Sequence, residues 1–266
     1  MPTLYVAHRG GAARWPENSL TAFRHALAAG ARILECDVHL TADGEVAVIH
    51  DPTLDRTTGA RGAVGGCTAA DLKAARLRGP DGALTDECVP TLREVLTLAA
   101  PAVTALLVEV KTPGSAVRYE RRGERFVPVP GARYEGLERR VLDLVGAAGL
   151  AERTVILAFN PAVLAEVRRV APAQPLALLV DDHHVEEAGA PSLETVAWAR
   201  AAGATFLGLH VSLCEAAVVE AAHAAGIAVG VFTVNDETVM RRLAGWGVDV
   251  IISDRADLVA RLQSES

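Results

Sequence analysis

The chain has 266 residues, of which half are hydrophobic and 4% aromatic, and its 26 Lys and Arg against 33 Asp and Glu give a formal net charge of −7. Such a chain can bury a full core, which excludes the disordered, fibrous and coiled-coil classes. The acidic balance argues against a nucleic-acid partner, because a phosphate backbone requires a basic stripe.

The cysteines and the amino terminus predict a cytoplasmic protein. No C-x-x-C pair is present, so we expect four free, buried thiols rather than a zinc site or a disulfide framework, at Cys36, Cys67, Cys88 and Cys214. The start MPTLYVAHRGG lacks the charged and long apolar regions of a signal peptide. The longest apolar stretch, residues 96–108, is too short for a bilayer and contains Pro101, so we expect no stable membrane association.

Eight aliphatic runs recur along the chain, each nearly continuous in apolar residues, as in strands buried on both faces of a parallel sheet. They span residues 3–7, 32–38, 105–111, 154–159, 175–180, 205–210, 227–234 and 248–253. The segments between them have helical periodicity, and several end in glycine before the next run. Units of about 33 residues predict an α/β fold, a TIM (β/α)8 barrel that occupies residues 1–266 as a single catalytic domain. A doubly wound open sheet is the alternative, but no G-x-G-x-x-G follows the first run.

Two segments interrupt this repeat. The stretch HLTADGEVAVIHD after the second run carries Asp43-Gly44 at a tight turn, which predicts a hairpin that returns His50 to the barrel mouth. Residues 51–90 then predict a small insertion over the top of the barrel, with one short helix at 69–75. Residues 112–134 surround the charged run RYERRGER with Pro and Gly, which predicts an exposed loop rather than a lid over the substrate.

Catalytic side chains of such barrels lie at the carboxyl ends of strands, and three predicted strand ends are polar. They are His8-Arg9-Gly10, Glu35-Cys36-Asp37 and Glu109-Val110-Lys111. Residues two apart on a strand share a face, so Glu35 projects with Asp37 and Glu109 with Lys111. Three converging carboxylates repel each other, and a hard divalent cation would relieve the repulsion. A buried salt-bridge network with Arg9 and Lys111 explains the same pattern, and the spacing does not choose between the two.

Histidines add candidates for proton transfer. His8 and His50 are expected at the mouth on separate elements, where a pair beside a bound metal suits general acid/base catalysis. His210, at the end of the sixth run, is a secondary candidate for the pocket. The other histidines are expected at the surface: His25, His39, His183, His184 and His223. Arg9 and Lys111 would neutralise a phosphate ester, whereas the lack of a G-x-x-x-x-G-K cradle argues against P-loop nucleotide hydrolysis.

Taken in order, these motifs resemble those of the glycerophosphodiester phosphodiesterase family, over nearly the whole chain. The matching residues are His8-Arg9-Gly10, Pro16-Glu17-Asn18-Ser19, Glu35-x-Asp37-Val38, Thr41-x-Asp43-Gly44, His50-Asp51-x-x-Leu54-x-Arg56-Thr57-Thr58, Glu109-Val110-Lys111, Phe232-Thr233-Val234-Asn235 and Gly247-Val248-Asp249-x-Ile251-Ile252-Ser253-Asp254. Many motifs in order at family-like spacing make coincidence improbable.

The resemblance implies a role for each site residue. His8 and His50 match the acid/base pair, Arg9 and Lys111 match phosphate contacts, and the matching metal ligands are Glu35, Asp37 and Glu109. The implied cofactor is one divalent cation, Mg²⁺ first, with Ca²⁺ or Mn²⁺ as alternatives. Phe232 stands where the family commonly has Trp, as an aromatic wall near the alcohol.

Two motif positions have a rim or structural role, and two depart from the family. Glu17 and Asn18 match a motif that shapes the rim. Either Asn18 or Ser19 could also cap the first helix, and we favour a structural role for Asn18. Ser19 replaces the usual Thr, and Ala158 stands where relatives often have Ser, which removes a hydrogen bond from the pocket and leaves substrate preference open.

We therefore predict metal-dependent hydrolysis of glycerophosphodiesters, such as glycerophosphocholine or glycerophosphoethanolamine, to glycerol 3-phosphate and an alcohol. One histidine would deprotonate the nucleophile, and the other would protonate the leaving alcohol. The nucleophile is either the neighbouring substrate hydroxyl or water. The sequence does not assign the acid and base roles between the two histidines. The alternatives are a phospholipase D-like lyase acting on lysolipid head groups and a non-catalytic phosphodiester-binding protein. Both histidines and all three carboxylates are present, which argues against the second. The sequence does not indicate the oligomeric state.

Overall fold

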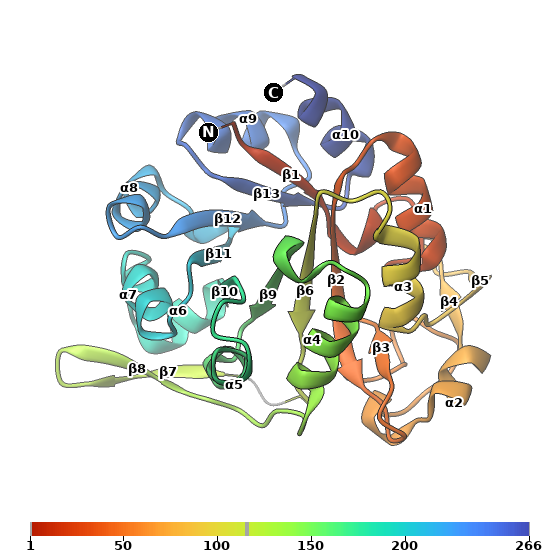
Figure 1. Ribbon diagram of the computed structural model, residues 1–266. Helices are drawn as coiled ribbons and strands as arrows, with labels where there is room; N and C mark the ends of the chain where they lie inside the picture. The colour runs from red at the N-terminus through yellow and green to blue at the C-terminus, as the bar shows by residue number, and fades with distance from the viewer. Residues whose placement is uncertain (1, 115–116, 266) are drawn as a thin grey trace.

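A computed structural model describes residues 2–114 and 117–265. Its centre is a closed barrel of eight parallel strands, in which β1 pairs with both β13 and β2 to complete the ring (Figure 1). The strands are β1 (Leu4–Ala7), β2 (Ile33–Leu40), β6 (Ala105–Val110), β9 (Thr154–Ala158), β10 (Leu176–Val180), β11 (Phe206–His210), β12 (Ala228–Phe232) and β13 (Val250–Ser253). Seven of the eight predicted runs contain one of them, and β2 begins in the second run and extends beyond it to Leu40, so the TIM barrel is confirmed and the open-sheet alternative is wrong.

Helices surround the barrel and bury one apolar stripe each against the strands (Figure 1). They are α1 (Leu20–Ala29), α3 (Leu92–Ala99), α4 (Leu137–Ala147), α5 (Pro161–Val170), α6 (Asp182–Ala188), α7 (Glu194–Ala201), α8 (Ala216–Ala224), α9 (Glu237–Gly245) and α10 (Ala256–Glu265). Within the ranges described, no helix has both the length and the apolar character needed to cross a bilayer. A second apolar cluster fills the barrel interior with Val6, Ile33, Leu107, Leu157, Ala177, Leu179 and Ile252.

The predicted hairpin and insertion after β2 are both present. β3 (Val46–Val48) returns antiparallel along β2, with Val38 opposite Val48. The insertion contains α2 (Ala69–Ala74) at the predicted helix and an antiparallel pair, β4 (Arg76–Arg78) with β5 (Leu84–Cys88). Leu54, Val64, Leu72 and Leu77 contribute to a small core of its own. Single 3-10 turns complete the fold: η1 (His8–Gly10), η2 (Val64–Gly66), η3 (Ala151–Arg153) and η4 (Val211–Leu213).

The prediction of an exposed loop at 112–134 is wrong. Apart from residues 115–116, which lie outside the described ranges, the segment forms a hairpin of β7 (Arg118–Arg122) and β8 (Arg125–Val129) (Figure 1). Tyr119 is 4% exposed and stacks on Trp198 of α7, with ring centroids 3.7 Å apart. Arg118, Glu120 and Arg122 face the side of β7 opposite Tyr119, because successive strand residues alternate between the two faces.

The four cysteines all lie within the described ranges and are free. The expectation of free thiols is therefore confirmed. Cys36 and Cys214 are buried as expected, whereas Cys67 and Cys88 are half-buried.

Candidate active site

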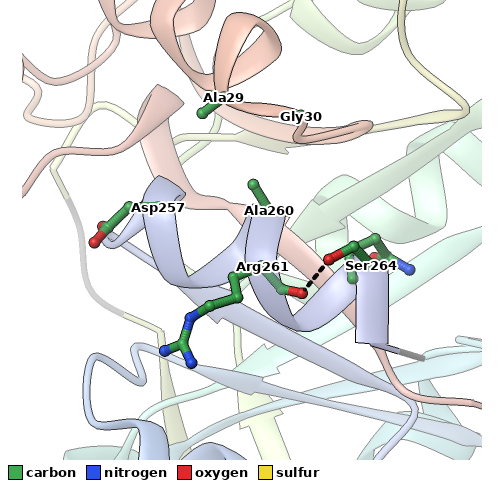
Figure 2. Close-up of a pocket in the computed structure, with 7 residues that line it drawn as sticks. Ala29, Gly30, Asp257, Ala260, Arg261 and Ser264 are labelled. Atoms are coloured by element: carbon green, nitrogen blue, oxygen red, sulfur yellow. Dashed lines mark hydrogen bonds between the residues drawn. The ribbon is translucent and has the colours of Figure 1, made fainter.

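A cavity of about 250 Å³ opens at the carboxyl ends of the barrel strands. A pocket of about 400 Å³ adjoins it and shares His50, Glu109, Phe159 and Asp181 with it; we call the two together the mouth cavity. Another hollow, shown in Figure 2, lies outside the barrel between Ala29-Gly30 and helix α10. None of the predicted site residues lines that hollow, so the mouth cavity is the candidate active site.

The three predicted carboxylates meet in the mouth. Glu35 and Asp37 project from β2, and Asp37 lies in register with Glu109 on β6. One oxygen from each lies within 4.8 Å of the others, and all three residues are buried. Parallel pairing of β2 with β6 therefore builds this acidic centre, defined here as Glu35, Asp37 and Glu109.

Two cationic side chains pair with part of the acidic centre. Lys111 Nζ lies 2.5 Å from Glu109 Oε1 and 3.0 Å from Asp37 Oδ1, and Arg9 Nε lies 3.1 Å from Asp37 Oδ2. Burial alone would raise the pKa of Asp37, but Lys111 and Arg9 outweigh it and hold that pKa well below its usual range. The expected salt-bridge network is therefore present for Asp37 and Glu109.

Glu35 differs from its two neighbours. It accepts a hydrogen bond from the Arg9 backbone N–H at 3.0 Å, and its nearest ionisable partner is His8, with Nε2 3.9 Å from Oε2. No Lys or Arg side chain of the described residues forms an ion pair with it. Burial and the charges of Asp37 and Glu109 raise the pKa of Glu35 well above its usual range. Three carboxylates thus face two cationic side chains, and this all-oxygen donor set with uncompensated negative charge fits a hard divalent cation.

The turn after β1 aligns this backbone donor. Arg9 has a φ of 50°, and Gly10 follows with a φ of 78°. A Cβ at Gly10 would lie 2.8 Å from atoms of Ala22, so α1 approaches too closely for any larger residue. The tight turn places His8 and the Arg9 N–H beside the acidic centre.

Each predicted catalytic histidine has a carboxylate at Nδ1. His8 Nδ1 lies 2.7 Å from Asp254 Oδ1, and His50 Nδ1 lies 2.7 Å from Asp51 Oδ1. In the neutral imidazole, Nδ1–H then donates to the carboxylate and the lone pair remains on Nε2. Both rings line the mouth cavity, so each is oriented for proton transfer there.

The carboxylates behind the histidines are themselves fixed, and sequence reasoning gave these supports no role. Asn235 Nδ2 donates to Asp254 Oδ2 at 2.8 Å, and Arg56 Nε donates to Asp51 Oδ2 at 2.7 Å. Burial alone would raise the pKa of Asp254, but the hydrogen bonds from His8 and Asn235 outweigh it and lower that pKa. All four residues occur in the matched motifs, but only the fold shows what they contact.

The rim motif after β1 also contacts the centre. Asn18 Nδ2 donates to Asp37 Oδ2 at 2.8 Å, whereas Ser19 caps α1 by accepting the Ala22 N–H. Ser19 is therefore the cap of α1, and Asn18, for which we favour a structural role, contacts Asp37 of the acidic centre. Glu17 accepts hydrogen bonds from Arg56 at 2.8 Å and from Arg9 at 3.0 Å, which joins the insertion to the barrel rim.

His39 and His184 are buried, so their expected surface position is wrong. His39 Nε2 lies 3.0 Å from the His50 carbonyl oxygen, and its Nδ1 lies 3.0 Å from the Tyr134 hydroxyl. A carbonyl can only accept, so Nε2–H donates to it and Nδ1 accepts from Tyr134. Burial lowers the pKa of His39 to about 4, which keeps it neutral while it holds the His50 backbone. The other three expected surface histidines, His25, His183 and His223, are exposed.

Aromatic residues form the other side of the mouth. Phe232 lines it as predicted and packs edge-to-face on Phe159, with centroids 5.9 Å apart; His210 lines it as well. Sequence reasoning missed Phe159 and emphasised its neighbour Ala158. Ala158 is fully buried in the core between strands and helices and lines neither part of the mouth cavity, so its expected effect on the pocket is wrong.

Fold and site together define a (β/α)8-barrel enzyme with an acidic centre whose donor set fits a divalent cation, beside two histidines that are hydrogen-bonded to carboxylates. Residues 8–258 match the model of the Glycerophosphoryl diester phosphodiesterase family, and the chain belongs to that family. The resemblance inferred from the sequence motifs is therefore confirmed, as is the prediction of an enzyme of phosphoric diester hydrolysis.

Individual relatives agree with this assignment. The chain is 31% identical over 275 residues to a glycerophosphodiester phosphodiesterase of Bacillus altitudinis, covering 99% of each chain. A solved glycerophosphodiester phosphodiesterase from Agrobacterium tumefaciens superposes with a TM-score of 0.74 at 26% identity, covering 97% of this chain and 99% of that one. An Oleispira antarctica phosphodiesterase, solved with the product sn-glycerol-3-phosphate, shares the fold at 23% identity with a TM-score of 0.77, covering 100% and 98%.

Proposed function

We propose that the protein hydrolyses glycerophosphodiesters, with glycerophosphocholine and glycerophosphoethanolamine as substrates, to sn-glycerol 3-phosphate and an alcohol. The observation that carries this proposal is the arrangement in the mouth, where Glu35 lies within 3.9 Å of the anchored His8 ring and has no Lys or Arg partner among the described residues. The product bound to the Oleispira antarctica relative supports the same substrate class.

Glu35, Asp37 and Glu109 would hold one divalent cation, with Mg²⁺ preferred and Ca²⁺ or Mn²⁺ as alternatives. When bound, the ion supplies neutralisation of negative charge on the phosphoryl group. Arg9 and Lys111 line the mouth cavity and add fixed positive charge, so we assign them to the phosphate oxygens. The cation, Arg9 and Lys111 together would neutralise the negative charge of the phosphodiester, although the overall charge of the chain is negative.

The two histidines would transfer the protons. One Nε2 takes the proton of the nucleophile, and the other ring, protonated, gives a proton to the oxygen of the leaving alcohol. Asp254 and Asp51 orient these rings through Nδ1. The nucleophile is the substrate hydroxyl next to the ester or a water molecule, and the transient release of a cyclic phosphate distinguishes the first route from the second.

We also propose that the insertion at 51–90 belongs to the same single catalytic domain as the barrel. Its Arg56 bonds both Asp51, beside the proposed catalytic His50, and Glu17 of the barrel rim. Limited proteolysis that releases an active barrel without the insertion would contradict this arrangement.

The test is a coupled assay for sn-glycerol 3-phosphate released from glycerophosphocholine, with Mg²⁺ and with EDTA. We expect His8→Ala and His50→Ala to abolish turnover, and His25→Ala, at an exposed position of α1, to retain it. Full activity in both mouth variants, or no turnover by the wild type across several head groups and metals, overturns the proposal.

A further inference from the structure

The wall of the mouth cavity across from the acidic centre has its own chemistry. In the strand order of the closed barrel, β10 and β11 lie across the ring from β1 and β2. Phe159 follows β9, Asp181 follows β10 and Phe232 ends β12, and all three line the cavity. We call these three residues the distal wall. Because the phosphate is assigned to the other side, the distal wall is where the alcohol part of a diester would lie.

Asp181 gives the distal wall a negative charge. Its carboxylate lines both parts of the mouth cavity, and its ionic contact is to His183, with Nδ1 3.8 Å from Oδ1. Across the described residues, no Lys or Arg side chain forms an ion pair with it. The same carboxylate accepts the Asp182 N–H at 2.8 Å as the N-cap of α6. Burial and the side-chain contact with Asp182 raise the pKa of Asp181, so a cationic ligand beside it would favour the charged carboxylate.

The aromatic rings beside Asp181 suit a cation more than an anion. The face of an aromatic ring attracts ammonium groups, and a nearby carboxylate strengthens that preference. Phe159 already has Lys111 Nζ 5.8 Å from its ring centroid, which leaves Phe232 as the ring for a ligand. Arg9 and Lys111, the Arg and Lys side chains that line the cavity, are paired with Asp37, so their charges are directed to the acidic side.

We propose that the distal wall binds a positively charged alcohol, a primary or quaternary ammonium head group, and thereby selects diesters of cationic alcohols over diesters of neutral alcohols. Asp181 compensates the charge and Phe232 packs against the ammonium substituents. This inference rests on the proposed function, because it requires the phosphate at the acidic centre. It assigns a preference among substrates and adds no chemical step.

The test removes one negative charge at each of two positions, Asp181 in the cavity and Glu186 outside it. Asp181→Asn keeps a good helix N-cap and removes the negative charge from the cavity. Glu186→Gln is the control, because this residue is exposed on helix α6 and lines neither part of the mouth cavity. The coupled sn-glycerol 3-phosphate assay with Mg²⁺ compares glycerophosphocholine, whose alcohol part is cationic, with glycerophosphoglycerol, whose alcohol part is neutral, since both release the product that the assay detects.

We expect Asp181→Asn to lower kcat/KM for glycerophosphocholine by roughly threefold to thirtyfold, mainly through KM. Turnover of glycerophosphoglycerol should change by less than about twofold, and Glu186→Gln should leave the turnover of both substrates within that range. Phe232→Leu keeps an apolar side chain but removes the aromatic ring. We expect this variant also to lower kcat/KM for glycerophosphocholine more than for glycerophosphoglycerol.

Three outcomes overturn the inference: an equal loss on both substrates, no loss on either, or the same selective loss in Glu186→Gln. If Asp181→Asn fails to fold, the Phe232→Leu comparison decides the inference by the same criterion. Lack of wild-type turnover on every diester would instead overturn the proposed function, so the two failures are distinguishable.

Discussion

Asp254 is the residue through which the proposed role of His8 can be tested most sharply. Its Oδ1 lies 2.7 Å from His8 Nδ1 and its Oδ2 accepts Asn235 Nδ2–H at 2.8 Å, so both oxygens have a donor. In Asp254→Asn, an amide NH₂ that faces His8 forces the proton onto Nε2, where the lone pair is needed. An NH₂ that faces Asn235 brings two donors together. In either orientation the substituted amide loses one of the two hydrogen bonds that Asp254 accepts, although the side chain keeps its size.

The expected magnitude follows from these contacts. A hydrogen bond to a charged group contributes about 1.5–3 kcal/mol, and a positioned acid or base contributes about 10²–10⁴ in rate. We therefore expect Asp254→Asn to lower kcat by about 10²–10⁴. KM should change by less than about threefold, because Asp254 does not line the mouth cavity and an interaction made only in the transition state leaves ground-state binding unchanged.

The assay is the release of sn-glycerol 3-phosphate under saturating substrate and Mg²⁺, with thermal unfolding measured in parallel. Asp249→Asn is the matched control, since Asp249 Oδ2 lies 2.8 Å from His223 Nε2 in an Asp–His pair outside the mouth. Its kcat should equal that of the wild type. If Asp254→Asn retains kcat within about threefold while folded, His8 does not depend on this carboxylate and the reasoning is refuted.

Three further predictions concern metal, charge and pH. EDTA should abolish activity. Mg²⁺ at about 100 times its Kd should stabilise the fold by about 2.7 kcal/mol in fluorimetric melts. If Mg²⁺ raises the melting temperature of Glu35→Gln as much as that of the wild type, the cation site is contradicted. Lys111→Met should lower the free energy of urea unfolding by about 3–5 kcal/mol, because Asp37 and Glu109 lose their shared partner; an unchanged midpoint would refute the pairing. The pKa of His39 is about 4 in the folded state against 6.5 in the unfolded state, so its contribution to stability is complete above pH 6.5 and is lost as the pH falls towards 4. By pH 4.5 the free energy of urea unfolding should have fallen by about 2–3 kcal/mol for this reason. In His39→Asn this pH-dependent loss should be absent.

The barrel could be predicted because its strands are covered on both faces. A strand buried on both sides must be nearly continuous in apolar residues, and β10, with every residue buried, shows this most clearly. The β7–β8 hairpin could not be predicted in the same way. Its inward face depends on Tyr119 against Trp198, in a strand where Arg and Glu are the majority. That contact joins segments far apart in the sequence, which periodicity does not detect.

The candidate site could be predicted where the positions of its residues on one strand determine which side chains share a face. The shared face of Glu35 and Asp37 follows from a period of two, and parallel pairing then adds Glu109. The partners of the histidines were less accessible, because His8 and Asp254 are separated by 246 positions. His39 was misplaced for a related reason: a polar residue in a strand suggests the surface unless its hydrogen-bond partners are known.

The two histidines depend on different parts of the chain. His8 is held by Asp254 at the end of the closing strand β13, and His50 is held by Asp51, which the insertion supports through Arg56. Glu17 then joins Arg56 to Arg9 beside the acidic centre. Because these supports share no residue, a change in the insertion should displace His50 and leave the His8 pair intact. Separate supports of this kind orient the two rings independently, in keeping with the separate acid and base roles proposed for them.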